Sequence, residues 1–352
     1  VSLGYGALTS NTTADNNVAI GRTALESNTT GAGNVAIGKD ALIANTTASN
    51  NTAVGMDALT ANTTGAENVA LGRAALQATT TGSYNVAVGM GSLETNTTAY
   101  YNTAVGYDSL KLSTTGERNA ALGYAALKNN TTGSYNVAVG MSAMELNTTG
   151  ANNTTIGADS LVFNTTGVGN SALGKGALTA NTTANNNVAI GEHALYANTT
   201  GAGNVAIGNG ALDTNTTASN NVAVGLNALT SNTTGVNNTV IGSSTASSLT
   251  TALGCSIVGH ANNVSSASGN YAMALGYNLT CAAGYTTLGA GGSDTRLLHG
   301  ATSWAAVSDE RYKKDITAST AGLAFVNDLT PRTWNYRTLG ELPETFSAYD
   351  AD

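Results

Sequence analysis

The residues best suited to chemistry lie in one short segment near the end of the sequence, residues 308–316, which read S-D-E-R-Y-K-K-D-I. A serine hydroxyl becomes a nucleophile when a nearby base takes its proton. No histidine follows His299, and a lysine with a depressed pKa can serve as the base instead. The same string also suits a helix start, with a serine N-cap and acidic residues in the first turn. Both interpretations are compatible with the residues.

The segment resembles the start of the intramolecular chaperone found at the C-terminus of endosialidases and of many phage tail fibres and tailspikes. The matching positions are Ser308, Asp309, Arg311, Lys313 and Ile316. A second motif of this family, L-T-P-R-T-W-N-Y, follows at residues 329–336. After the first motif and up to the start of the second, apolar residues predict a short amphipathic helix that carries Leu323, Phe325, Val326 and Leu329.

This resemblance implies a specific reaction. In the family, the domain trimerises, holds three fibre chains in register while they fold, and then cuts itself off before its first serine. Carried over to this sequence, Ser308 is the nucleophile, Lys313 is its base, and the bond after Val307 is cut in a single turnover. Asp309, Glu310 and Arg311 are expected to form local ion pairs rather than to take part in the reaction.

A seventeen-residue repeat organises the rest of the sequence. Glycine recurs at this interval seventeen times, from Gly4 through Gly21 and Gly38 to Gly276. Such a period is typical of a chain that coils around an axis with one turn per repeat. Position zero is defined as the asparagine four residues before each of these glycines. At about 4.8 Å per turn, the coils would extend over about 80 Å.

Two columns of the repeat predict the interior of the coil. Position three is large and aliphatic, as at Ile20, and position eight of the units from Asn17 to Asn221 is leucine or once methionine, as at Leu25. We expect these columns to stack inside. Position two is nearly always alanine, and its side chain points to the opposite face of an extended segment. A constant small residue on that face predicts close packing against a second chain. The apolar burial per turn is small against the entropy cost of ordering seventeen residues, and this favours three chains around an axis.

Asparagine and glycine mark the turns. Asparagine occupies position zero in fourteen successive units, beginning at Asn17 and Asn34, and position eleven of the units from Asn17 to Asn221 except at Thr79 and Ser113. We expect these side chains to form ladders, and the invariant glycine to adopt a backbone conformation closed to other residues or to turn a tight corner. Every N-T-T string is also a glycosylation sequon, for which a turn with an asparagine ladder is the simpler interpretation.

The string N-V-A-I-G-x-x-A-L resembles the head repeats of trimeric autotransporter adhesins over residues 1–276. This resemblance implies a left-handed parallel β-roll assembled as a homotrimer. The sequence departs from that family in its period, which is usually near fourteen residues, by an inserted N-T-T turn. The expected fold class is all-β: a parallel β-roll or β-solenoid of seventeen-residue coils, homotrimeric, followed by a small α+β chaperone segment.

Changes in the repeat divide the sequence into four parts. Residues 1–254 are regular coils, and residues 255–292 keep the glycine register but lose N-T-T, which predicts irregular capping coils. Residues 293–307 are interpreted as a linker with the scissile strand, after a flexible break at residues 290–294. Residues 308–352 are expected to be part of the chaperone domain. Since the first residue falls in mid-repeat, we interpret the sequence as part of a longer polypeptide.

Composition excludes several classes of partner. The net charge of −8 argues against nucleic acid, and the sequence has no run of about 18 apolar residues, so we expect no membrane insertion. No metal or other cofactor is expected, because Cys255 and Cys281 lack the spacing of a metal site and His193, His260 and His299 are isolated. The cysteines form either a disulfide or two buried thiols.

A homotrimeric fibre on a virion surface, such as a phage tail fibre, is the function that these observations favour. Its partner would be a host-surface receptor, either a glycan or an outer-surface protein, bound by residues 255–300 or by a tip outside this sequence. The alternative is a cellular adhesin or extracellular filament, although an autotransporter needs a C-terminal membrane anchor that is missing here. A polysaccharide-degrading tailspike is disfavoured because glycosidases need paired carboxylates, whereas the repeats offer unpaired acids such as Asp40, Asp57, Glu67 and Asp108.

Overall fold

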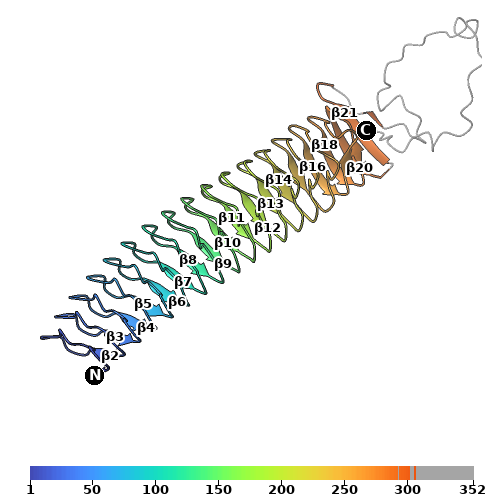
Figure 1. Ribbon diagram of the computed structural model, residues 1–352. Helices are drawn as coiled ribbons and strands as arrows, with labels where there is room; N and C mark the ends of the chain where they lie inside the picture. Colours follow the sequence, from blue (N-terminus) through green and yellow to red (C-terminus); the bar gives the residue numbers. More distant parts are fainter. Residues whose placement is uncertain (292, 302–304, 307–352) are drawn as a thin grey trace, which may run out of the picture. The chain divides into compact units, whose positions relative to one another are not determined.

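The computed structural model describes residues 1–291, 293–301 and 305–306. In Figure 1 the chain winds into a parallel β-solenoid, with one strand stacked on the next along the axis. Successive regular strands pair in parallel with an offset of one repeat, so that Ala19 lies opposite Ala36 and Ala36 lies opposite Ala53. The all-β solenoid predicted from the seventeen-residue repeat is therefore confirmed.

Each regular coil contributes one short strand. These strands are β1 (Ser2–Leu3), β2 (Val18–Ile20), β3 (Val35–Ile37), β4 (Thr52–Val54), β5 (Val69–Leu71), β6 (Val86–Val88), β7 (Thr103–Val105), β8 (Ala120–Leu122), β9 (Val137–Val139), β10 (Thr154–Ile156), β11 (Ser171–Leu173), β12 (Val188–Ile190), β13 (Val205–Ile207), β14 (Val222–Val224) and β15 (Thr239–Ile241). Backbone hydrogen bonds between coils also extend beyond the strands: the Leu25 amide donates to the Ala41 carbonyl at 3.0 Å.

The last coils have longer strands and end in antiparallel pairing. The parallel stack continues through β16 (Ser256–His260), β18 (Met273–Tyr277) and β20 (Tyr285–Ala290), while a small second sheet pairs β17 (Asn263–Val264) with β19 (Thr280–Cys281). Strand β21 (Ser293–Leu298) then runs antiparallel to β20, and β22 (Ala305–Ala306) runs antiparallel to β21.

This ending differs from the flexible break and linker expected around residues 290–298. Ala290 pairs with Ser293, so the glycine-rich string is the turn of a hairpin rather than a break in the structure. Part of the expected linker is strand β21. The physical reason is that the free edge of the last parallel strand has unpaired backbone groups, which the returning strand satisfies.

The interior of each coil is formed by positions two, seven and eight. Ala19, Ala24 and Leu25 are each 0% exposed, and the same columns are buried in the following coils. Ile20, which we expected inside, is only half-buried on the outer face of β2, and Leu122 at the same position is 49% exposed. The prediction for position eight is confirmed.

The predictions for positions two and three were wrong. Alternation along a strand places positions one and three on one face and position two on the other, and the expectation chose the wrong face for the interior. The alanine of position two packs in the same buried cluster as the leucine of position eight within one chain. Alanine is therefore small because the coil is narrow, and not because a second chain lies against it.

The invariant glycine is required at a corner where neighbouring coils touch through their backbones. Gly21 has a φ of +135°, and a Cβ atom there would lie 2.5 Å from the carbonyl oxygen of Gly38 in the next coil. Any side chain would add this clash to a backbone conformation that L-residues rarely adopt. The predicted role of this glycine is confirmed.

Two asparagine columns hold the turns from inside. At position zero, Asn17 Oδ1 accepts a hydrogen bond from the Asn34 amide at 2.8 Å, and Asn17 Nδ2 donates to the Gly31 carbonyl at 2.8 Å. At position eleven, Asn28 Nδ2 donates to Asn11 Oδ1 of the preceding coil and to the same Gly31 carbonyl, both at 3.0 Å. The two columns therefore share one backbone acceptor in each coil, and the predicted ladders are confirmed.

The N-T-T strings owe their regularity to these ladders. Asn28 is 0% exposed, and its Nδ2 atom already donates to two acceptors. The following Thr29 hydroxyl donates to the Thr46 carbonyl of the next coil at 3.0 Å. The folded coil thus leaves the sequon nitrogen inaccessible to a glycan, which agrees with the interpretation of N-T-T as a structural turn.

Thr79 and Ser113 interrupt the ladder at position eleven, and Leu249 ends it, which leaves Asn232 Oδ1 buried without a partner among the described residues. Asn62 Oδ1 and Asn96 Oδ1 are buried without a hydrogen-bond partner, because the next coils offer Thr79 and Ser113 in place of an amide donor. The Ser113 hydroxyl is also buried and unpartnered among the described residues. A buried acceptor without a donor costs stability, so these positions are defects in an otherwise continuous ladder.

Substituting either interruption with asparagine should stabilise the solenoid. Thr79→Asn and Ser113→Asn each provide a donor to the orphaned oxygen of the preceding coil, for an expected gain of about 1 kcal/mol in the free energy of unfolding. Thermal or denaturant unfolding measures this gain. Thr81→Asn, the same chemical change at an exposed site, is the matched control, and equal stability of Thr79→Asn and Thr81→Asn would contradict the prediction.

Candidate functional site

The predicted self-cleavage residues Val307, Ser308 and Lys313 lie outside the residues that the structure describes. The same holds for the amphipathic helix and the α+β structure expected in residues 308–352. The last described strand, β22, ends at Ala306, one residue before the predicted scissile bond. The functional surfaces that the structure describes lie along the solenoid.

The outer face of the strands is an apolar stripe along the solenoid. Positions one and three of the repeat point away from the coil interior and are mostly valine, isoleucine, leucine or threonine. At position three the side chains of Leu122, Leu173 and Leu275 are 49%, 48% and 57% exposed. A contiguous apolar surface of this kind marks an interaction site on a soluble protein.

The stripe is hollowed where the strands become longer. Between β16, β18 and β20 a groove of about 260 Å³ is lined mainly by Val258, Met273, Leu275 and Leu288. It lies within residues 255–300, the region that we expected to form a receptor tip. The groove is almost entirely apolar, so it is suited to apolar side chains rather than to polar ligands.

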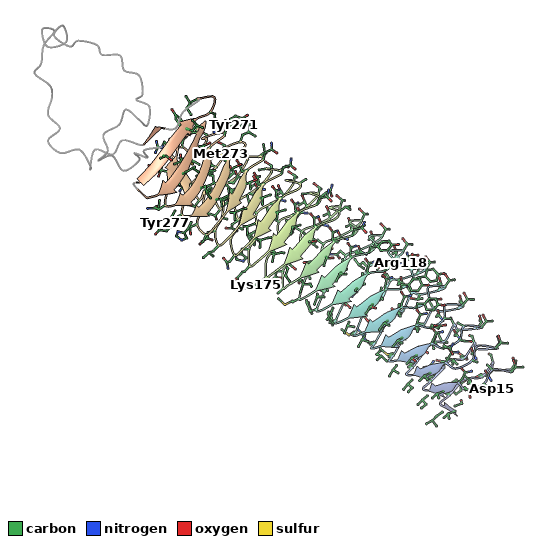
Figure 2. All side chains as sticks on the ribbon, turned by 180° about the vertical axis from the view of Figure 1, so that it is seen from behind. Asp15, Arg118, Lys175, Tyr271, Met273 and Tyr277 are labelled. Atoms are coloured by element: carbon green, nitrogen blue, oxygen red, sulfur yellow. The ribbon has the colours of Figure 1, made fainter. Side chains whose placement is uncertain are left out.

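Polar and aromatic side chains border the stripe on two edges. Position sixteen lies two residues before the strand, and position five follows the invariant glycine. Figure 2 shows Arg118 and Tyr271, at position sixteen, along one edge, and Lys175 and Tyr277, at position five, along the other. These edges vary from coil to coil, whereas the interior columns hardly change.

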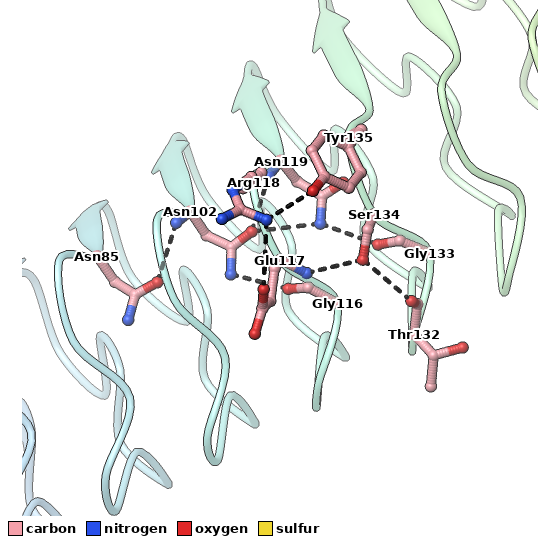
Figure 3. A network of polar contacts seen from close by, with 10 residues as sticks. All are labelled: Asn85, Asn102, Gly116, Glu117, Arg118, Asn119, Thr132, Gly133, Ser134 and Tyr135. Carbon is pink, nitrogen blue, oxygen red and sulfur yellow. Dashed lines mark hydrogen bonds and ion pairs between the residues drawn. The ribbon is translucent and has the colours of Figure 1, made fainter.

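One part of the position-sixteen edge forms a continuous column of contacts. Tyr84 and Tyr101 stack with their ring centroids 5.1 Å apart and their planes at 9°. The Arg118 guanidinium lies 5.5 Å from the centroid of Tyr101 and 5.3 Å from that of Tyr135, and its Nη1 donates to the Tyr135 hydroxyl at 2.6 Å (Figure 3). Tyr101 is therefore packed between Tyr84 and the Arg118 guanidinium, and the three tyrosines of the column remain half exposed.

This column was missed in the sequence, although the signal was present. Tyr84, Tyr101 and Tyr135 are separated by multiples of seventeen residues, and Arg118 fills the intervening place. In a solenoid, equal position in the repeat means contact between adjacent coils. A search for aromatic residues at the repeat spacing would therefore have found it.

The acidic residues of the repeats do not form a pair of catalytic carboxylates. Asp40, Asp57 and Asp108 occupy position six of different coils. The Thr23 hydroxyl and Lys39 hold the pKa of Asp40 below its ordinary value, and Lys111 Nζ lies 3.1 Å from Asp108 Oδ1. A general acid for glycoside hydrolysis needs a raised pKa, which is the opposite shift. Asp40 and Asp108 are thus held in ion pairs with lysine side chains.

The part of the chain that the structure describes shows no sign of a metal centre or of a membrane-spanning helix. Within this part, no group of three or more histidine, cysteine or acidic side chains is arranged to hold a metal ion. It also contains no helix with the length and apolar character needed to cross a membrane. His193, His260 and His299 are exposed, which agrees with their interpretation as isolated surface histidines.

Both cysteines are buried free thiols, which settles the alternative left by the sequence. Cys255 takes position zero of its coil: its amide donates to Asn238 Oδ1 at 2.9 Å, and its Sγ lies 3.2 Å from the Gly269 carbonyl. It therefore stands in for an asparagine of the ladder. Burial raises the pKa of Cys255, and it raises the pKa of Cys281 to about 11.

Both thiols should resist modification in the folded protein at pH 8. With a pKa of about 11, only about one Cys281 in a thousand is a thiolate at that pH. We expect no colour from an aromatic disulfide reagent in buffer and two equivalents per chain in denaturant. Ser268→Cys, at an exposed position, should add one rapidly reacting thiol. Rapid reaction of a native cysteine in the wild-type protein would contradict this assignment.

Comparison with protein-family models matches residues 308–348 to the family described as chaperone of endosialidase. No curated protein and no solved structure matches the chain. The family match spans both motifs, at 308–316 and 329–336, that suggested this resemblance. The resemblance predicted from the sequence is thus confirmed: the chain joins a parallel β-solenoid to a segment similar to the chaperone of endosialidase, a combination that fits a fibre of the phage tail-fibre or tailspike type.

Proposed function

We propose that this chain is the shaft of a homotrimeric fibre on a virion surface, that it attaches to a host-surface receptor, and that its C-terminal segment assists folding and then cleaves itself. The observation that carries the proposal is the match of residues 308–348 to the chaperone of endosialidase, in the same chain as a solenoid of nearly identical coils. The self-cleavage would use Ser308 as nucleophile and Lys313 as its base, at the bond after Val307.

The regularity of the solenoid gives a reason for a folding assistant. The alanine column, the asparagine ladders and the glycine corner recur in coil after coil, so a strand has almost the same contacts when it is displaced by one repeat. Three such chains would also fit together nearly as well one coil out of register. A clamp that aligns the three C-termini before the coils form would remove this ambiguity.

The apolar stripe supports contacts between chains. It follows the strands that carry Leu122 and Leu173 and continues to the groove at Leu275 and Leu288. Burying apolar surface contributes about 25 cal/mol per Å², so covering a stripe of this length is a large gain. We assign the contacts of the trimer to this face, in place of the alanine column that we first expected to make them.

Substitution of Ser308 tests the processing step. The chain, expressed with the whole C-terminal region of its gene, should give a trimer whose subunits end at Val307, because the serine hydroxyl starts the cleavage. Ser308→Ala and Lys313→Ala should each give an uncut trimer. Intact-mass spectrometry and light scattering measure both properties. Uncut monomers from the wild type and from both variants would refute the proposed processing and assembly.

Charges on the stripe test the assembly surface. Leu122→Glu, Ile156→Glu and Leu173→Glu together would bring like charges from three chains close to one another, and we expect the trimer to dissociate or to fail to form. The matched control places the same three charges on exposed turns, at Thr132, Thr149 and Thr166, and should remain trimeric. Analytical ultracentrifugation distinguishes the two. A stable trimer of the stripe variant would show that another face makes the contacts.

A further inference from the structure

A hollow of about 320 Å³ opens on the turns that follow the strands of the solenoid. It forms because position six of one coil is Gly176, while the coils on either side carry Asp159 and His193 at the same position. A Cβ atom on Gly176 would lie 2.7 Å from His193 Cδ2, so the glycine leaves room for the imidazole. The rest of the lining includes Phe163, Lys175, Thr179 and Tyr196.

The charged groups of this hollow are available to a ligand. Neither Asp159 nor Lys175 takes part in an ion pair in the described part of the chain. The His193 ring contacts Tyr196, with the centroids 4.8 Å apart and the planes at 44°. Thr179 Oγ1 instead lies 2.9 Å from the carbonyl oxygens of both Asp159 and Gly176, which share its one hydroxyl proton, and so it ties together the backbone beneath the hollow.

The lining combines polar groups with apolar surface. Phe163 and Tyr196 are 49% and 42% exposed, and they supply aromatic surface beside a carboxylate, an ammonium group and an imidazole. A pyranose ring has the complementary chemistry, because its hydroxyl groups bond to such polar groups while its C–H faces pack on aromatic rings. A volume of about 320 Å³ holds one or two sugar rings.

A second hollow, at Gly91, is less suitable. Its lining is dominated by charged side chains that already pair with one another: Lys111 Nζ lies 3.1 Å from Asp108 and 3.3 Å from Glu94. A sugar hydroxyl would have to compete with these ion pairs. The comparison favours the hollow at Gly176, where both charges are free and two aromatic side chains are present.

We propose that the hollow at Gly176 binds one pyranose unit of a surface glycan. Asp159 and Lys175 bond to the sugar hydroxyls, and Tyr196 and Phe163 pack against its C–H surface. The assignment of the sugar to a cell-surface glycan rests on the proposed function of the chain as an attachment fibre. Three copies of the site in a trimer would raise the affinity for a repetitive polysaccharide by avidity.

Saturation-transfer difference NMR on the full chain tests this site. The probes are the methyl pyranosides of glucose, galactose, mannose, rhamnose and N-acetylglucosamine. We expect transfer to at least one probe, and a loss of affinity of about tenfold in Tyr196→Ala and in Asp159→Asn. Tyr124→Ala removes another exposed tyrosine, which lies outside the hollow, and should leave the signal unchanged. Thermal unfolding of each variant checks that the solenoid is intact.

Absence of transfer to all five probes would overturn the proposal, and so would equal transfer to the wild type and to Tyr196→Ala. The result is separable from the proposed function. A self-cleaving trimer that binds none of the sugars would remain a fibre without this site. Sugar binding by a chain that neither trimerises nor cleaves itself would retain the site and overturn the fibre assignment.

Discussion

The hydrogen bonds from two asparagine side chains to the carbonyl of position fourteen, present in most regular coils, are the interaction on which the solenoid depends. The apolar interior is thin, with little more than two alanines and one leucine per coil, such as Ala19, Ala24 and Leu25. Such a core cannot by itself determine the path of the long turns. The amides of Asn17 and Asn28 converge on the Gly31 carbonyl and fix that path, and their columns continue into the neighbouring coils. Polar side chains thus do in this interior what apolar packing does in a globular domain.

This division of roles separates structure from recognition. Positions zero, two, four, eight and eleven are nearly invariant because each touches its own copy in the next coil. The edges at positions five and sixteen, and position six on the turns, are free to vary. The Tyr84 to Tyr135 column and the hollow at Gly176 both lie at these variable positions. A function that distinguishes one part of the solenoid from another must reside at positions that vary, since the columns at positions zero, two, four, eight and eleven hardly change.

Much of the fold could be predicted from the sequence, because period, glycine corner and asparagine ladder follow from stacking identical coils. The sequence could not show which face of the strand points inward. Ala19 and Ile20 are both apolar, and alternation alone does not say which of them lies in the interior. The backbone of Leu25 was also unpredictable: its φ of +54° is uncommon for leucine, and nothing in the sequence marks it. The site motif at Ser308 was recognisable from residue identity, but its geometry depends on residues 307–352, which lie beyond the described coils. The contacts of Arg118 with Tyr101 and Tyr135 could be predicted only once it was known which residues stack in adjacent coils.

The offset of one repeat between paired strands also bears on how such a shaft can change over generations. If a block of seventeen residues within the regular coils is removed or duplicated, each coil still stacks on a coil of the same kind. The asparagine, glycine and leucine columns keep the same partners as before. Recombination between repeats would therefore alter the length by whole coils, about 4.8 Å each, without disturbing either end. The length of the solenoid can thus change in small, equal steps through genetic events that leave the structure of each coil unchanged.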